Sequence, residues 1–194
     1  MNVLAAAKQH LGSLDRVTRV VRLGVLIATS GDFFDQPKVA DAVSDLFRDV
    51  FGIQLPAAPT PFGTYVETVQ TGNLLFFSWM LPVVDHKPKY LGRLGKEFNI
   101  EAGRDAAYTA ALNVLAAAKQ HLGSLDRVTR VVRLGVFIAT SGDFFDQPEV
   151  ADAVSDLFRD VFGIQKTSVR VVVGVASLPL GVPIELDVIF EVGE

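Results

Sequence analysis

The chain has 194 residues with a formal net charge of −4, and 49% of its residues are hydrophobic while 21% are charged. These values are typical of a globular protein of about one domain and exclude a disordered chain or a collagen. The absence of cysteine excludes disulfides and thiolate metal sites, and the negative charge disfavours nucleic-acid binding. No apolar run reaches the roughly 18 residues of a membrane span, and the first residues lack the basic region of a secretory signal. We therefore expect a cytoplasmic protein.

The most unusual feature of the sequence is an internal repeat. Residues 1–54 reappear as residues 112–165, at a constant offset of 111. The two copies differ at three positions only: Met1/Leu112, Leu26/Phe137 and Lys38/Glu149. A natural tandem duplication and an engineered copy both explain such identity, and the absence of drift favours engineering. We therefore divide the chain into a duplicated segment, residues 1–54, and a second domain, residues 55–194.

Local patterns predict the elements of residues 55–194. In chain order they are two hairpin strands, a helix, a strand, a helix and two final strands: Thr64–Gln70, Leu74–Ser78, Glu101–Leu122, Val128–Thr140, Pro148–Phe162, Ser168–Ala176 and Val182–Phe190. Alternation and β-branched residues indicate the strands. Helical spacing with a glycine after each helix indicates the helices, and Asp146 is predicted to cap the second one. The repeated segment is therefore helix–strand–helix.

These elements predict an α+β fold in which two helices pack on one face of a sheet, plus an extra N-terminal α-β-α copy. In the first of the final strands, Val169 and Val171 are expected to point to the core. Arg170 would then lie on the polar face, as would Glu185 on the adjacent strand. An ordinary surface ion pair between them is the alternative to a functional role.

Residues 55–194 resemble the RidA/YjgF family. The residues that carry the resemblance are PFGTYVETVQTGNLLFFS, ALNVLAAAKQHLGSLDRV, DVFG and VRVVVGVASLPLGVPIELDVIFEV. The resemblance implies a chorismate-mutase-like sheet, a homotrimer whose sheets form a central barrel, and ligand clefts between subunits. It further implies hydrolysis of enamines and imines, such as 2-aminoacrylate, to a keto acid and ammonia, with no metal or organic cofactor. Some members have been called endoribonucleases, which the acidic charge of this chain disfavours.

The resemblance also assigns roles to single residues. Arg170 matches the arginine that binds a carboxylate, and a planar guanidinium suits that task. Glu185 matches the acidic residue that positions water, while Tyr65 and Ser78 match the tyrosine and serine of the cleft. Trp79 stands where the family has glycine, and its indole is expected to obstruct the cleft.

Two further positions depart from the family pattern. Val172 replaces a cysteine that several subgroups also lack, and Asp152 or Ala151 replaces an asparagine. A negative charge near the cleft would oppose a carboxylate substrate. The three histidines, His10, His86 and His121, do not form a metal-ligand cluster, so no metal is expected.

Two functions remain open from the sequence. The first copy lacks partners for its apolar residues, which favours an engineered folding scaffold with domain swapping and little activity. The alternative is an active deaminase of the family type. In either case we expect a homo-oligomer, as a trimer or a swapped assembly, that can bind a small carboxylate but neither nucleic acid nor membrane.

Overall fold

The computed structural model describes residues 53–193. Within this range the strands are β1 Thr68–Thr71, β2 Leu74–Phe77, β3 Val83–Val84, β4 Lys87–Pro88, β5 Val128–Ala139, β6 Val169–Val175 and β7 Ile184–Val192. The α-helices are α3 Ile100–Leu122 and α4 Gln147–Phe162. The expectations that concern residues 1–52, including His10 and the fold of the first copy, lie outside the described residues.

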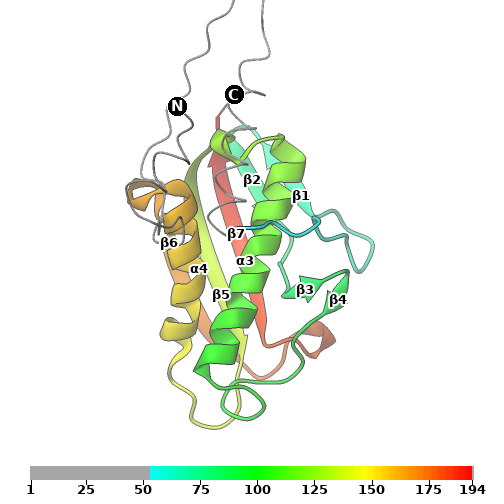
Figure 1. Ribbon diagram of the computed structural model, residues 1–194, viewed down its shortest axis with the longest axis vertical. Coiled ribbons are helices and arrows are strands. Elements are labelled where there is room, and N and C mark those ends of the chain that lie inside the picture. Colours follow the sequence, from blue (N-terminus) through cyan, green and yellow to red (C-terminus); the bar gives the residue numbers. More distant parts are fainter. Residues whose placement is uncertain (1–52, 194) are drawn as a thin grey trace, which may run out of the picture. The chain divides into compact units, whose positions relative to one another are not determined.

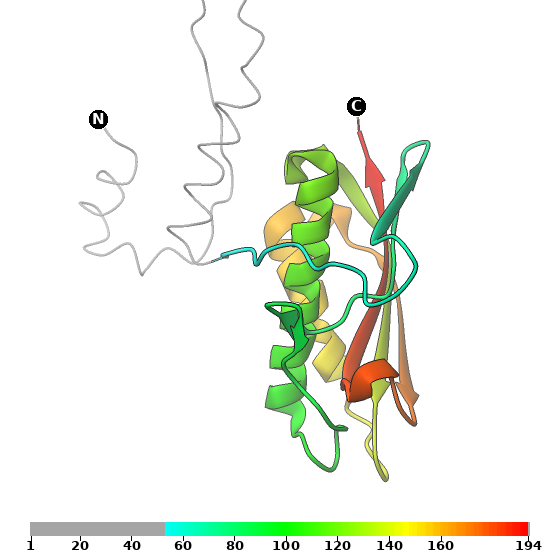
Figure 2. The same ribbon diagram turned by 90° about the vertical axis from the view of Figure 1, so that its right-hand side faces the viewer.

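Five of the strands form one mixed sheet in the order β1-β2-β7-β5-β6. Only the β5–β6 pair is parallel, and the others are antiparallel. Both helices cover the same face of this sheet (Figure 1, Figure 2). The core therefore lies between the helices and the sheet, as the sequence predicted for an α+β fold.

No helix of residues 53–193 covers the other face of the sheet, which is called the open face below. Phe190 on β7 contacts Phe158 on α4, so even-numbered side chains of β7 point toward the helices. Glu185 therefore points to the open face, together with its cross-strand neighbour Phe137 and the next neighbour, Val173 on β6.

Helix α3 begins and ends as its sequence predicts. The Asn99 side chain accepts a hydrogen bond from the backbone N–H of Ala102, and the chain turns at Gly123, whose φ of 81° suits glycine. A stripe of alanines and apolar residues is buried against the sheet, which lets the helix approach it closely. Helix α4 also ends at a glycine, but the expected cap at Asp146 makes no side-chain hydrogen bond.

A second, two-stranded sheet of β3 and β4 precedes α3. Asp85 and His86 form the hairpin turn with positive φ values of 50° and 60°, which is the conformation that two-residue hairpins favour. Asn113 on α3 holds the start of this hairpin, since its buried side chain donates to the carbonyls of Leu81 and Val83.

The two final strands are not neighbours, contrary to the prediction. β5 lies between β6 and β7, because β6 pairs in parallel with β5 after the α4 crossover. The expectation that Val169 and Val171 point to the core is also wrong. Their side chains lie on the open face, where Val169 is 70% and Val171 44% exposed.

Candidate active site

Glu185 combines deep burial with an unpaired oxygen. The residue is 3% exposed, and its Oε2 atom has no hydrogen-bond partner among the described residues. Burial disfavours the charged carboxylate and raises the pKa of Glu185 from its ordinary value of 4.5 to about 7. A carboxyl group with such a pKa can both donate and accept a proton near neutral pH.

An aromatic pair lies beside Glu185 on the open face. Phe137 is the cross-strand neighbour of Glu185. Trp79 stacks on Phe137 with ring centroids 4.3 Å apart and an angle of 18° between the planes. Sequence reasoning singled out Trp79 but missed Phe137, although Phe137 is one of the three positions at which the two copies differ.

Tyr65 and Ser78 lie where the β1–β2 hairpin begins and ends. The Ser78 hydroxyl donates to Oε2 of Glu67 over 3.1 Å, and the Tyr65 hydroxyl accepts a hydrogen bond from the Phe62 N–H. Burial raises the pKa of Glu67 above its ordinary value, although the Ser78 hydrogen bond and the charge of His86 act in the opposite direction. No sequence motif marked Glu67 as a site residue.

The segment that follows Ser78 connects these residues to Glu185. Met80 forms a backbone bridge with Leu186, the residue after Glu185. Trp79, Phe137 and Glu185 therefore lie together on the open face and are called the Glu185 group below. No contact joins Tyr65 or Ser78 to Glu185 among the described residues.

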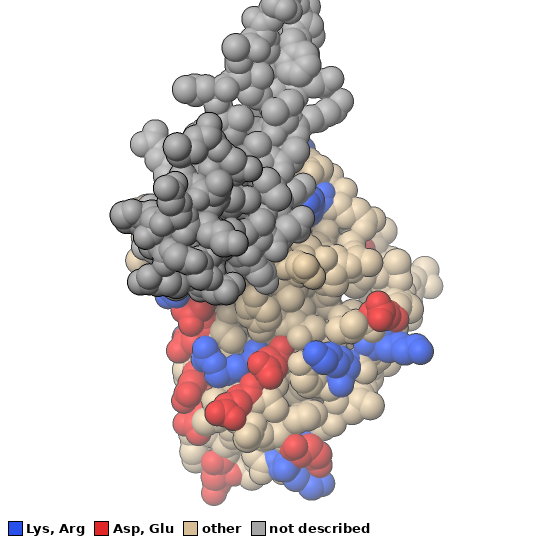
Figure 3. Space-filling model, in the orientation of Figure 1, with Lys and Arg blue, Asp and Glu red and all other residues tan. Residues whose placement is uncertain are grey.

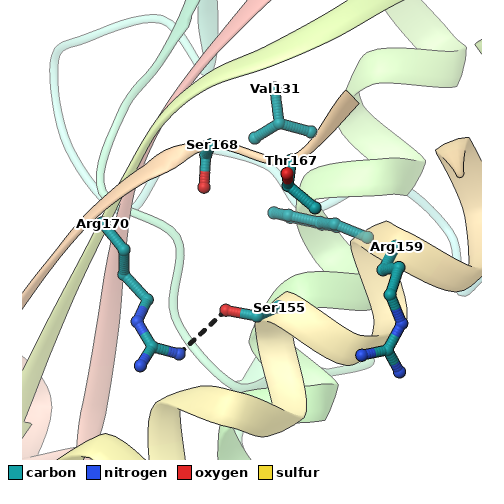
Figure 4. Close-up of a pocket in the computed structure, with 7 residues that line it drawn as sticks. Val131, Ser155, Arg159, Thr167, Ser168 and Arg170 are labelled. Carbon is teal, nitrogen blue, oxygen red and sulfur yellow. Dashed lines mark hydrogen bonds between the residues drawn. The ribbon is translucent and has the colours of Figure 1, made fainter. Parts of the chain in front are cut away.

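Arg170 lies on the other face of the sheet, against α4. Its Nη1 atom donates to Oδ1 of Asp152 over 2.6 Å and to Oγ of Ser155 over 3.0 Å. Arg170 and Ser155 line a pocket of about 220 Å³ between α4 and β6, together with the apolar side chains of Val131 and Phe158. Figure 4 shows the Arg170 side chain reaching from β6 toward Ser155 on α4. Asp152, Ser155 and Arg170 are called the Arg170 group below.

The expectation that Arg170 and Glu185 share one face of adjacent strands is wrong. Strand β5 separates their strands, and Arg170 contacts α4 whereas Glu185 points to the open face. The Arg170–Glu185 ion pair within one chain is therefore excluded by this arrangement. One chain therefore carries two separate clusters of candidate site residues, and the sequence could not reveal this because it does not encode strand order locally.

The two described histidines make structural contacts. His121 bonds through its ring nitrogens to Thr68 and Gln70, which ties the last turn of α3 to β1. His86 bonds to Thr60 and stacks on Phe62. Within residues 53–193, no group of three or more His, Cys, Asp or Glu side chains is placed to hold a metal ion. In the same range, neither helix has the length and apolar character needed to cross a membrane.

Residues 52–190 match the family described as "YjgF/chorismate_mutase-like, putative endoribonuclease". Over 141 residues the chain is 42% identical to Protein TCP17 of Trypanosoma cruzi, which covers 72% of this chain and 88% of that protein. Over 136 residues it is 29% identical to a protein of Dermatophagoides farinae named 2-iminobutanoate/2-iminopropanoate deaminase, covering 70% of this chain and 91% of that one.

A solved structure shares both the fold and part of the sequence. The crystal structure of the protein Atu1372 of Agrobacterium tumefaciens, described as being of unknown function, has a TM-score of 0.69 and 33% sequence identity. The match covers 75% of this chain and 90% of that chain. The family match over residues 52–190 covers nearly all of the described residues and only the last three residues of the first copy.

Proposed function

Because the chain belongs to the RidA/YjgF family, we propose that it hydrolyses small enamines and imines, with Glu185 as the group that transfers protons. The observation that carries this proposal is the buried, unpaired carboxyl of Glu185 with its pKa of about 7. The name of the Dermatophagoides farinae relative gives the substrate class independent support.

The reaction needs one water molecule and no cofactor. An enamine first takes a proton from solvent on carbon and becomes the protonated imine. Water then adds to the imine carbon, and the Glu185 carboxylate takes a proton from that water, which leaves a hydroxyl and an amine on the same carbon. Glu185 gives its proton to the nitrogen and is regenerated. The carbon–nitrogen bond then breaks with its electron pair on nitrogen, and the departing ammonia takes the hydroxyl proton as the carbonyl forms.

We further propose that the complete site forms between two copies of the chain. The carboxylate of a substrate would bind Arg170 of one copy, while Glu185 and its group come from another. Two features support this arrangement: the two clusters lie on opposite faces of one chain, and the open face exposes apolar side chains that an assembly would bury. The exposed apolar residues are Val69, Phe76, Trp79, Val171 and Val173. The trimer implied by the family resemblance is the assembly we propose.

The other roles considered receive less support. The comparisons do not support an engineered folding or domain-swapping scaffold, and the origin of the duplication stays a prediction. Cleavage of RNA, which the family description mentions, is disfavoured by the net charge of −4. Figure 3 shows Asp and Glu side chains gathered along the face over α4, which would repel a phosphate backbone.

A complementation experiment tests the proposed reaction and the shared site together. The parent chain is assayed for release of ammonia from 2-iminobutanoate, generated in place from an amino acid by an amino-acid oxidase. Arg170→Ala and Glu185→Gln are each expected to lose activity. When the two inactive variants are unfolded, mixed in equal amounts and refolded, about a quarter of the sites regain both residues if assembly is random.

The Trp79→Gly background makes this assay more sensitive, because removing the indole opens the surface beside Glu185. Recovery of about a quarter of the activity supports a site between copies. Activity that is absent from the parent and from Trp79→Gly refutes the proposed reaction. Single variants that are inactive and do not recover on mixing refute the shared site.

A further inference from the structure

We propose that Asp152 competes internally with carboxylate ligands for Arg170, and so restricts which substrates this chain accepts. The inference rests on the proposed function, in which Arg170 anchors a carboxylate. It goes beyond that function because it proposes that a second residue, Asp152, determines which ligands bind.

The contact between the two side chains is short and carries opposite charges. The distance of 2.6 Å from Nη1 of Arg170 to Oδ1 of Asp152 is typical of a strong charge-assisted hydrogen bond. Ser155, one helical turn after Asp152, accepts a second bond from the same nitrogen. The guanidinium is therefore held against α4 and its charge is balanced before any ligand arrives.

The remaining donors of Arg170 do not remove the conflict. Both recorded bonds use Nη1, so Nε and Nη2 stay available among the described contacts. A ligand carboxylate bound there would share one positive charge with Asp152, and the two carboxylates would repel each other. Because the Asp152 side chain is 50% exposed and that of Arg170 29%, solvent weakens this repulsion without abolishing it.

Among residues 53–193, the lining of the pocket does not supply a second free cation. Arg159 also lines the pocket, but its guanidinium pairs with Asp156 at 2.8 Å and lies 3.6 Å from Asp160. Acidic side chains gather along the visible part of the surface over α4, with a few basic side chains beside them (Figure 3). A small carboxylate that approaches the pocket therefore meets an arginine whose charge Asp152 already balances, and nearby acidic side chains repel it. An uncharged ligand is not repelled and can contact the apolar side chains of Val131 and Phe158.

Binding of 2-oxobutanoate, a product of the proposed reaction, tests this inference without any turnover. Its dissociation constant is measured on the intact chain from the broadening of the ligand's methyl resonance. Asp152→Asn keeps the shape of the side chain and removes its charge, so we expect binding about tenfold tighter, equivalent to about 1.4 kcal/mol. Asp105→Asn on α3 makes the same change in net charge away from both pocket arginines, and we expect less than a twofold effect.

A further variant assigns the effect to Arg170. In Asp152→Asn/Arg170→Ala the gain in affinity is expected to disappear. Thermal melting of each variant checks that it is folded, and Asp152→Ser replaces Asp152→Asn if the latter melts at a lower temperature.

The outcomes separate this inference from the proposed function. Tighter binding by Asp152→Asn together with an absence of turnover in every variant supports the inference and refutes the deaminase function. Turnover by the parent, with a dissociation constant and KM that Asp152→Asn leaves unchanged, overturns the inference and keeps the function. An equal gain from Asp105→Asn also overturns it, because net charge alone would then explain the effect.

Discussion

The protonation of Glu185 links the candidate active site to the stability of the fold. Its pKa is about 7 in the folded chain against an ordinary value of 4.5, so the folded state holds a proton that the unfolded state releases first. The stabilisation of the folded state by this proton is fully present below pH 4.5 and is lost as the pH rises through about 7. The free energy of unfolding falls by about 3 kcal/mol over this range. Because glutamine cannot ionise, we expect Glu185→Gln to lack this loss. The free energy of unfolding of the variant minus that of the parent is therefore expected to be larger at pH 8 than at pH 5.

Urea unfolding of both chains at the two pH values measures this difference. The matched control is Glu191→Gln, on the same strand and face. Glu191 is only partly buried, and its carboxylate bonds to Asn73 and Thr129, so its removal is expected to leave the pH dependence of the parent in place. If Glu185→Gln shows the same pH dependence as the parent, Glu185 does not titrate near neutral pH and cannot have the proposed role.

The two helices differ in how their N-termini are capped, which gives a prediction at the level of the elements. The Asn99 side chain accepts from the Ala102 N–H over 2.9 Å, whereas Asp146 makes no such bond at the start of α4. Asn99→Ala is therefore expected to lower the free energy of unfolding by about 1 kcal/mol. Asp146→Ala is expected to lower it by less than about 0.5 kcal/mol, and denaturant unfolding of both variants measures the contrast.

A loss from Asp146→Ala as large as that from Asn99→Ala would contradict the capping difference. The Asn113→Ala variant provides a reference value for the loss in free energy of unfolding in the same denaturant measurement. It leaves the Val83 carbonyl without the Asn113 donor, whereas the Leu81 carbonyl keeps the Val83 N–H as a donor. The loss of a partner typically costs about 1–3 kcal/mol when such a group is buried.

The elements that sequence reasoning predicted correctly are those with a local signal. The helices α3 and α4 and strand β5 have their periodicity and their glycine boundaries within the segment itself. The faces of β6 were assigned wrongly because its run of valines carries no alternation. Arg170 was then placed on a polar face shared with Glu185, whereas the structure pairs it with Asp152 on α4. Strand order depends on partners far away in the chain, so the separation of Arg170 from Glu185 could not be predicted.

At the scale of the whole molecule, the open face should determine how copies assemble. Val171 is 44% exposed near the middle of β6, and a lysine there would place a charge in the proposed contact. We expect the parent to form an oligomer and Val171→Lys to dissociate into a monomer near 21.0 kDa, as measured by light scattering after gel filtration. The change in assembly is expected without loss of helical signal in circular dichroism.

The matched control places the same charge on the helical side of the molecule. Tyr108 on α3 is 37% exposed, and Tyr108→Lys is expected to keep the parent's mass. A parent chain that is monomeric at all concentrations would remove the basis for a site between copies. Dissociation of Tyr108→Lys rather than Val171→Lys would move the contact to the helices.

The position of β7 has a consequence for how the protein is synthesised. This strand is the last of the described elements to leave the ribosome, yet it lies in the middle of the sheet between β2 and β5. Until it emerges, the β1–β2 hairpin and the β5–β6 pair are two fragments with unpaired edges and uncovered apolar side chains. Such fragments are prone to aggregation during translation. A nascent chain stalled before Ile184 should therefore bind chaperones, and release of the final strand completes the sheet in one step.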